Sequence, residues 1–126
     1  MSRIDDIRVE IEKIEEAYEF MLAYAAQGRS DEGAGPDGAQ IRILISQFSA
    51  AVGIIDRAVS IIPPDLPVAV AFIDQFKSDS ATMTSVLAIL LNSKNISSEM
   101  VDNTNGLISV RAYLTSLFFL DKAVLN

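Results

Sequence analysis

Apolar residues recur at alternating intervals of three and four positions near the start of the chain. The row comprises Ile4, Ile7, Ile11, Ile14, Tyr18, Met21 and Ala25. This spacing places the side chains on one stripe of an α-helix and is typical of helices that pack side by side. Ser2 is suited to cap the start of such a helix, and Gly28 to end it. The pattern predicts a helix over about residues 3–27.

A second segment, at about 38–61, has the same spacing and an additional apolar row. The first row comprises Ile41, Ile45, Phe48, Val52, Ile55, Val59 and Ile62, and the second comprises Ile43, Ala50, Ile54 and Ile61. A helix with two apolar faces is either central in its own domain or docked on another chain. We expect both to apply here. Four of the six glycines lie in residues 28–38, which predicts a mobile connector between the first two helices.

Pro63, Pro64 and Pro67 interrupt the chain before a third predicted helix at about 66–92, with Asp65 as its cap. The expected core positions of this helix are Ala69, Phe72, Ile73, Phe76, Met83, Val86, Leu87 and Leu90. Its end at residues 92–95 precedes a last helix at about 97–124.

The last predicted helix begins at Ser97, with Ile96 and Val101 placed to form a hydrophobic staple around this cap. Residues 102–106, DNTNG, are a strong turn signal inside this segment. Either one long helix tolerates these poor helix formers, or a short helix at 97–103 precedes a longer one at 106–124. We favour one long helix.

Together these segments predict an all-α protein: an antiparallel four-helix up-down-up-down bundle forming a single domain over residues 1–126. Half of the 126 residues are apolar, which is enough for a chain of this length to bury a sizeable core.

The composition disfavours several classes of function. The net charge is −7, and the ten basic residues are scattered, so we expect neither nucleic-acid nor membrane binding. The chain has no cysteine and no histidine, which removes thiol nucleophiles, zinc–thiolate sites and the commonest general acid–base group. An enzyme is therefore disfavoured, and we expect no cofactor. The charged start lacks an apolar signal segment, so a cytoplasmic location is expected.

Four glutamates, Glu12, Glu15, Glu16 and Glu19, share one face of the first predicted helix. This face lies opposite the apolar row, so we expect it to be solvated rather than to bind a metal. Gly33, Gly35 and Gly38 match the spacing of a dinucleotide-binding loop. They follow a helix and lie among acidic residues that would repel phosphate, so the connector interpretation is preferred.

Charged residues also interrupt the apolar segments of the later helices: Asp56, Arg57, Asp74, Arg111 and Asp121. Ion pairs between helices are the preferred explanation, since such pairs can set helix register. The alternative is a pocket for a small anion that uses Arg57 and Arg111.

The function predicted from these features is a non-enzymatic protein–protein interaction module: an adaptor, a regulatory subunit or a chaperone-like factor. It would form a homodimer or another oligomer, or bind a protein partner, by burying its spare apolar row against a partner helix. The predicted partner-binding residues are Ile43, Ile54, Ile61 and, as an aromatic anchor, Phe119.

The alternative is a bundle that holds a small apolar or anionic molecule between its helices. Phe72, Phe76 and Phe118 would line the pocket, and Arg111 would be its polar anchor.

Overall fold

A computed structural model describes residues 3–33, 36–62 and 66–125. The predicted capping roles of Ser2 and Asp65 lie outside these residues. The helices are α1 (Arg3–Ala26), α2 (Pro36–Val59), α3 (Val70–Asn92), α4 (Ser98–Gly106) and α5 (Ile108–Phe119), with a 3-10 turn η1 (Pro67–Ala69) before α3 and a π-helical turn η2 (Leu120–Val124) after α5. The described residues contain no strand, so the all-α prediction is confirmed.

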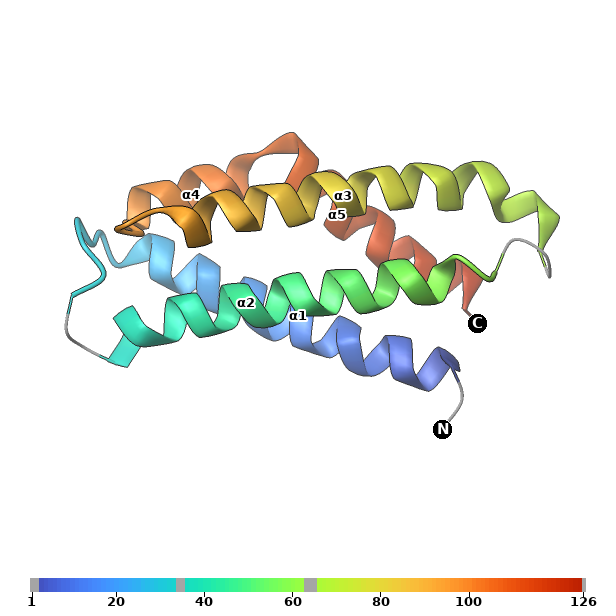
Figure 1. The fold of residues 1–126 in the computed structure, drawn as a ribbon, viewed down its shortest axis with the longest axis horizontal. Helices are drawn as coiled ribbons and strands as arrows, with labels where there is room; N and C mark the ends of the chain where they lie inside the picture. The colour runs from blue at the N-terminus through green and yellow to red at the C-terminus, as the bar shows by residue number, and fades with distance from the viewer. Residues whose placement is uncertain (1–2, 34–35, 63–65, 126) are drawn as a thin grey trace.

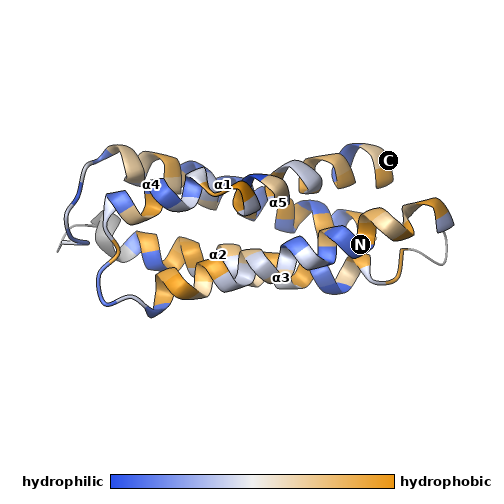
Figure 2. Ribbon diagram, turned by 90° about the horizontal axis from the view of Figure 1, so that it is seen from above, coloured by the Kyte–Doolittle hydropathy of each residue, from blue (hydrophilic) through white to orange (hydrophobic). Residues whose placement is uncertain are grey.

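The three longest helices run along the length of the molecule, and α4 and α5 follow one another beside them (Figure 1). α1 packs against α2 and α4, whereas α3 packs against α2 and α5. Every helix carries both apolar and polar residues along its length, as expected of helices with one buried side (Figure 2). Within the described ranges, no helix is both long enough and apolar enough to cross a membrane.

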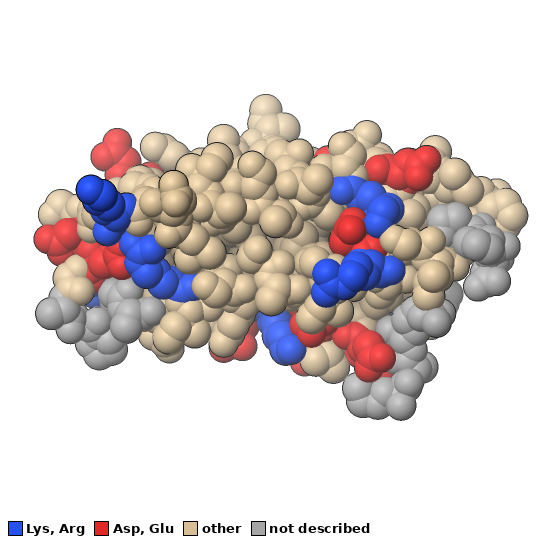
Figure 3. All heavy atoms as spheres, viewed as in Figure 1, with Lys and Arg blue, Asp and Glu red and all other residues tan. Residues whose placement is uncertain are grey.

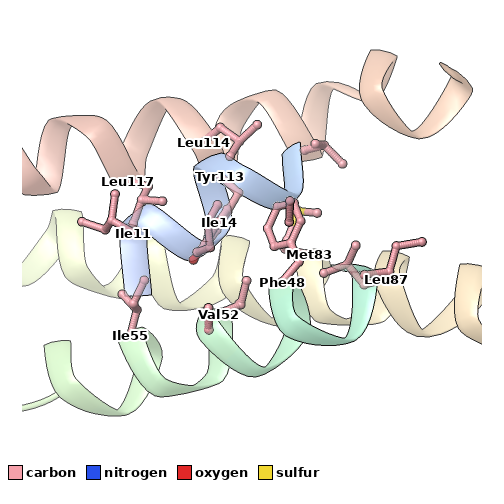
Figure 4. Packing of buried hydrophobic residues seen from close by; sticks show 14 of the residues in the cluster. Ile11, Ile14, Phe48, Val52, Ile55, Met83, Leu87, Tyr113, Leu114 and Leu117 are labelled. Atoms are coloured by element: carbon pink, nitrogen blue, oxygen red, sulfur yellow. The ribbon is translucent and has the colours of Figure 1, made fainter. Parts of the chain in front are cut away.

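The core is built from apolar side chains of all five helices, and Figure 4 shows several of them converging. The predicted rows are recovered best in α2 and α3. In α1, Ile4 is exposed and Tyr18 and Ala25 are only partly buried, whereas Ala17 and Tyr24 are fully buried. The physical reason is that a straight helix has 3.6 residues per turn, so its buried stripe drifts away from a strict seven-residue repeat.

The last predicted helix is not continuous, contrary to our expectation. Leu107 has an extended backbone (φ −63°, ψ 134°) and separates α4 from α5. If the helix continued from the buried Val101, residues 108, 112 and 115 would lie on the same face as Val101 and would point into the core. The break instead lets Val110, Tyr113 and Leu117 become buried, while Ile108 stays exposed. The turn signal at residues 102–106 correctly predicts a break in this segment. The break comes one residue later than the signal, because α4 continues to Gly106.

Two predicted helix ends are confirmed. The Ser97 hydroxyl accepts a hydrogen bond from the Met100 N–H (3.2 Å), and Ile96 and Val101 are both fully buried beside this cap. Gly28 follows α1 with φ +66°, a left-handed conformation that glycine adopts without steric cost.

Candidate functional site

The outward side of α2 carries the spare apolar row predicted from the sequence. Ile43, Ile54 and Ile61 are 51%, 37% and 42% exposed. Figure 3 shows the face formed by α2 and α3, where charged side chains gather towards the two ends and few lie in the middle. An uncharged, partly apolar surface along a helix is a common feature of protein interfaces.

A shallow cavity of about 460 Å³ lies on the α3 side of this row. It is lined by Ser46, Ser49, Ala50, Gly53, Ile54, Arg57 and Leu91. Most of the α2 residues in this lining are small, so the backbone of another helix could approach α2 closely here. Ile54 and Ala50 form the ridge between this cavity and the next.

A second cavity, of about 360 Å³, lies between α1 and α2 on the other side of Ile54. Glu10 lines it and is only 7% exposed. Its Oε1 atom accepts a hydrogen bond from Lys13 (3.1 Å), but its Oε2 atom is buried and has no hydrogen-bond partner among the described residues. A buried carboxylate oxygen without a hydrogen-bond partner costs stability.

Phe119, the predicted aromatic anchor, lies on α5 rather than on α2. It is near the end of α5, is 54% exposed, and packs edge-to-face against Phe72 of α3, with 5.0 Å between ring centroids. Phe119 therefore belongs to an aromatic contact between α3 and α5.

The residues of the alternative ligand pocket lie on different sides of α5. Phe76 is fully buried and stacks on Tyr113 (5.4 Å), and Phe72 packs beside Phe76 (6.2 Å). Phe118 lines a cavity of about 250 Å³ formed with α1, and Arg111 lines a different cavity between α1 and the α4–α5 break.

The predicted solvated face of α1 is confirmed, because Glu12, Glu15, Glu16 and Glu19 are all exposed. Within the described part of the chain, no group of three or more acidic side chains is placed to hold a metal ion.

Ion pairs between distant elements form at two of the predicted charges. Asp121 in η2 pairs with Arg8 in α1 (3.1 Å), and Asp56 in α2 pairs with Lys77 in α3 (3.3 Å). Arg57, Asp74 and Arg111 are exposed.

The most extensive polar arrangement lies at one end of the molecule and was not predicted. Glu32, in the segment after α1, accepts two hydrogen bonds from the Arg42 guanidinium of α2 (2.8 and 2.6 Å). Arg42 also donates to the backbone carbonyls of Leu91 and Ser93 at the end of α3 (3.1 and 2.8 Å). The hydrogen bonds from Arg42 hold the pKa of Glu32 below its usual value and raise that of Arg42. We call Glu32, Arg42 and the α3–α4 turn that they hold the polar clasp.

Further hydrogen bonds tie the segment after α1 to the α3–α4 turn. Asn95 accepts from the Glu32 N–H (3.0 Å) and donates to the Ser30 carbonyl (3.0 Å), and the Ile96 N–H donates to Glu32 Oε1 (2.7 Å). The Ser98 hydroxyl donates to the Tyr24 carbonyl (2.7 Å) and accepts from the Arg29 N–H (2.8 Å). Residues 29–32 are therefore held to the α3–α4 turn, contrary to the mobile connector that we expected over residues 28–38. Residues 36–38 belong to α2, and residues 34 and 35 lie outside the described ones.

The signals for the clasp were present in the sequence but not specific. Glu32 and Arg42 are ordinary charged residues ten positions apart. Arg42 bonds Ser93, 51 positions further along the chain, and Glu32 bonds Ile96, 64 positions further along. The clasp satisfies its own polar groups, which is typical of a structural network.

Comparison of the chain with models of known protein families found no match, and comparisons with curated proteins and with solved structures found no significant match.

Proposed function

We propose that this protein is a non-enzymatic helical interaction module, an adaptor, regulatory subunit or chaperone-like factor, that buries the outer side of α2 against another protein or a second copy of itself. The observation that carries this proposal is the row of Ile43 and Ile54 on one side of the 24-residue helix α2, continued by Ile61 two positions beyond its end, all three exposed. A helix of that length spans about 36 Å, which is long enough for a standard interface.

The surroundings of the row support the same proposal. Small residues on its α3 side allow close helix approach. The lack of cysteine is compatible with a reducing compartment, so the cytoplasm is the proposed location.

For the architecture, we propose a single domain of the up-down-up-down type in which α4 and α5 together form the fourth arm. The contacts of α1 with α2 and α4, and of α3 with α2 and α5, support this description.

The test compares two isoleucine-to-glutamate variants by light scattering coupled to size-exclusion chromatography. Ile54→Glu places a charge in the centre of the α2 row and should abolish self-association or partner capture. Ile89→Glu is the matched control, because Ile89 is 65% exposed on α3 and lies outside the α2 row. Both variants should keep the helical circular dichroism of the parent.

The same pair of variants serves as bait if the parent is a monomer. A partner identified by mass spectrometry after capture from the native host should be retained by Ile89→Glu and lost by Ile54→Glu. A monomeric parent whose captured proteins do not depend on Ile54 would contradict the proposal.

A further inference from the structure

A cavity separate from the α2 row lies between α1 and the α4–α5 break. Its volume is about 620 Å³, within the range of about 300–1,000 Å³ found for small-molecule sites. Gly106 and Leu107 line it, and a Cβ atom added at Gly106 would meet no atom within 4 Å. The break in the last arm therefore opens directly onto this space.

One buried acceptor at this cavity is unused. Asn105 lines the cavity and is 7% exposed. Its Nδ2 atom donates to the Met21 carbonyl of α1 (3.3 Å), which fixes the orientation of the amide. Its Oδ1 atom is buried and has no partner among the described residues. The fixed Asn105 amide therefore forms part of the cavity wall, and its signals can report on a ligand bound there.

The cavity also carries one charge of each sign. Arg111 of α5 and Asp102 of α4 both line it and are both exposed. Among the ion pairs of the described chain, none joins Arg111 to Asp102, so each group can face a ligand. Asp102 would repel a ligand that carries only negative charge, and Arg111 would repel a ligand that carries only positive charge.

The remaining lining is largely apolar. Leu22 and Leu107 are 46% and 42% exposed at the cavity, and Tyr18 lines it beside them. These side chains can cover the apolar body of a ligand whose charged groups are satisfied nearby.

We propose that this cavity binds a small zwitterion with an apolar body, namely an apolar α-amino acid. The ligand carboxylate pairs with Arg111, and its ammonium group pairs with Asp102. The ligand side chain packs over Leu22 and Tyr18. This site is independent of the proposed α2 interface.

The first test titrates the ¹⁵N-labelled full chain with L-leucine and follows its amide signals by NMR. Saturable shifts are expected in residues 18–26 and 102–111 and in the Asn105 side-chain amide. L-Leucinamide lacks the carboxylate, 4-methylpentanoate lacks the ammonium group, and glycine lacks the apolar body. L-Leucinamide and 4-methylpentanoate should each bind about tenfold or more weakly than L-leucine, since a hydrogen-bonded charge contributes at least that factor. Glycine should also bind about tenfold or more weakly, because it has no apolar side chain to bury.

The second test uses exposed positions, so that folding is preserved. Arg111→Gln and Asp102→Asn should each weaken L-leucine binding about tenfold, whereas Arg57→Gln, an exposed arginine on α2, should not change it. Circular dichroism checks that all three variants fold. The proposal is overturned by an absence of saturable shifts with L-leucine, by equal binding of any of the three analogues, or by unchanged binding in Arg111→Gln.

Discussion

Two tyrosines are fully buried and differ in what their hydroxyl groups meet. The Tyr24 hydroxyl of α1 donates to the Ile96 carbonyl (2.7 Å), and its ring lies under the Arg29 guanidinium (5.5 Å). The Tyr113 hydroxyl of α5 lies inside the core and has no hydrogen-bond partner among the described residues (Figure 4). Burial raises the pKa of both tyrosines, and the nearby Asp56 carboxylate raises that of Tyr113 further. Both hydroxyls therefore stay protonated at neutral pH.

The same substitution should have opposite effects at these two positions. Tyr113→Phe removes an unsatisfied hydroxyl from the core and should raise the free energy of unfolding by about 1 kcal/mol. Tyr24→Phe removes an existing hydrogen bond and leaves the Ile96 carbonyl unpaired. It should therefore lower the free energy of unfolding by about 1–2 kcal/mol. Urea denaturation followed by circular dichroism measures both values. A loss of stability in Tyr113→Phe equal to that in Tyr24→Phe would contradict the assignment.

At the scale of elements, the polar clasp joins three segments at one end of the molecule. Arg42 brings the end of α3 to the start of α2, and Glu32 brings the segment after α1 to the α3–α4 turn. Hydrogen bonds between charged groups are stronger than neutral ones, so this network orders residues whose composition is that of a flexible loop.

Breaking the clasp should destabilise the protein in a pH-dependent way. Glu32→Gln keeps the side-chain shape but removes the charge paired with Arg42, and should lower the free energy of unfolding at pH 7 by about 1–3 kcal/mol. Since the pKa of Glu32 is lowered in the folded state, its contribution is present above the unfolded pKa of about 4.3 and is lost as the pH falls through the folded value. The difference between parent and variant should therefore vanish in acid.

The control for this prediction is Glu12→Gln, at an exposed position of α1. It should change the free energy of unfolding by no more than about 0.5 kcal/mol. Urea titrations at several pH values test both variants, and a pH-independent defect in Glu32→Gln would exclude the charge pair as its cause.

Two glycines at helix ends should also respond oppositely to one substitution. Gly28 has φ +66° with no atom near its missing Cβ, so Gly28→Ala costs only backbone strain, about 1 kcal/mol. Gly106 ends α4 without a positive φ, and its Cβ would also meet nothing. Gly106→Ala should stabilise α4 by about 0.5–1 kcal/mol. Thermal unfolding of the two variants gives the signs directly, and equal signs would refute this account.

At the scale of the whole molecule, charge repulsion opposes contact between exposed apolar surfaces. The net charge is −7 at pH 7, and the isoelectric point is about 4.4. Charge far from zero keeps a protein soluble, so lowering the pH towards the isoelectric point removes this protection.

Association should therefore increase as the pH approaches about 4.4. Light scattering across the pH range measures it, and the increase should be smaller in Ile54→Glu than in Ile89→Glu, because the former interrupts the α2 row. Equal association of the two variants would show that the α2 row is not the surface responsible.

The sequence by itself determined that the chain is all-α and where its first three helices lie, to within a few residues at their ends. The Ser97 cap, the Gly28 end and the exposed row of α2 could be predicted because each depends on residues within a few positions of one another. Helical periodicity and capping are local properties of the chain.

Only the tertiary structure decided the break at Leu107, the clasp between Glu32 and Arg42, and the different partners of Tyr24 and Tyr113. The break resets the helical phase so that Val110 and Tyr113 meet a core supplied by other helices. The clasp and the tyrosine contacts join residues from distant parts of the chain. Such pairings depend on how the helices cross and how far each is rotated about its axis, which local spacing leaves open.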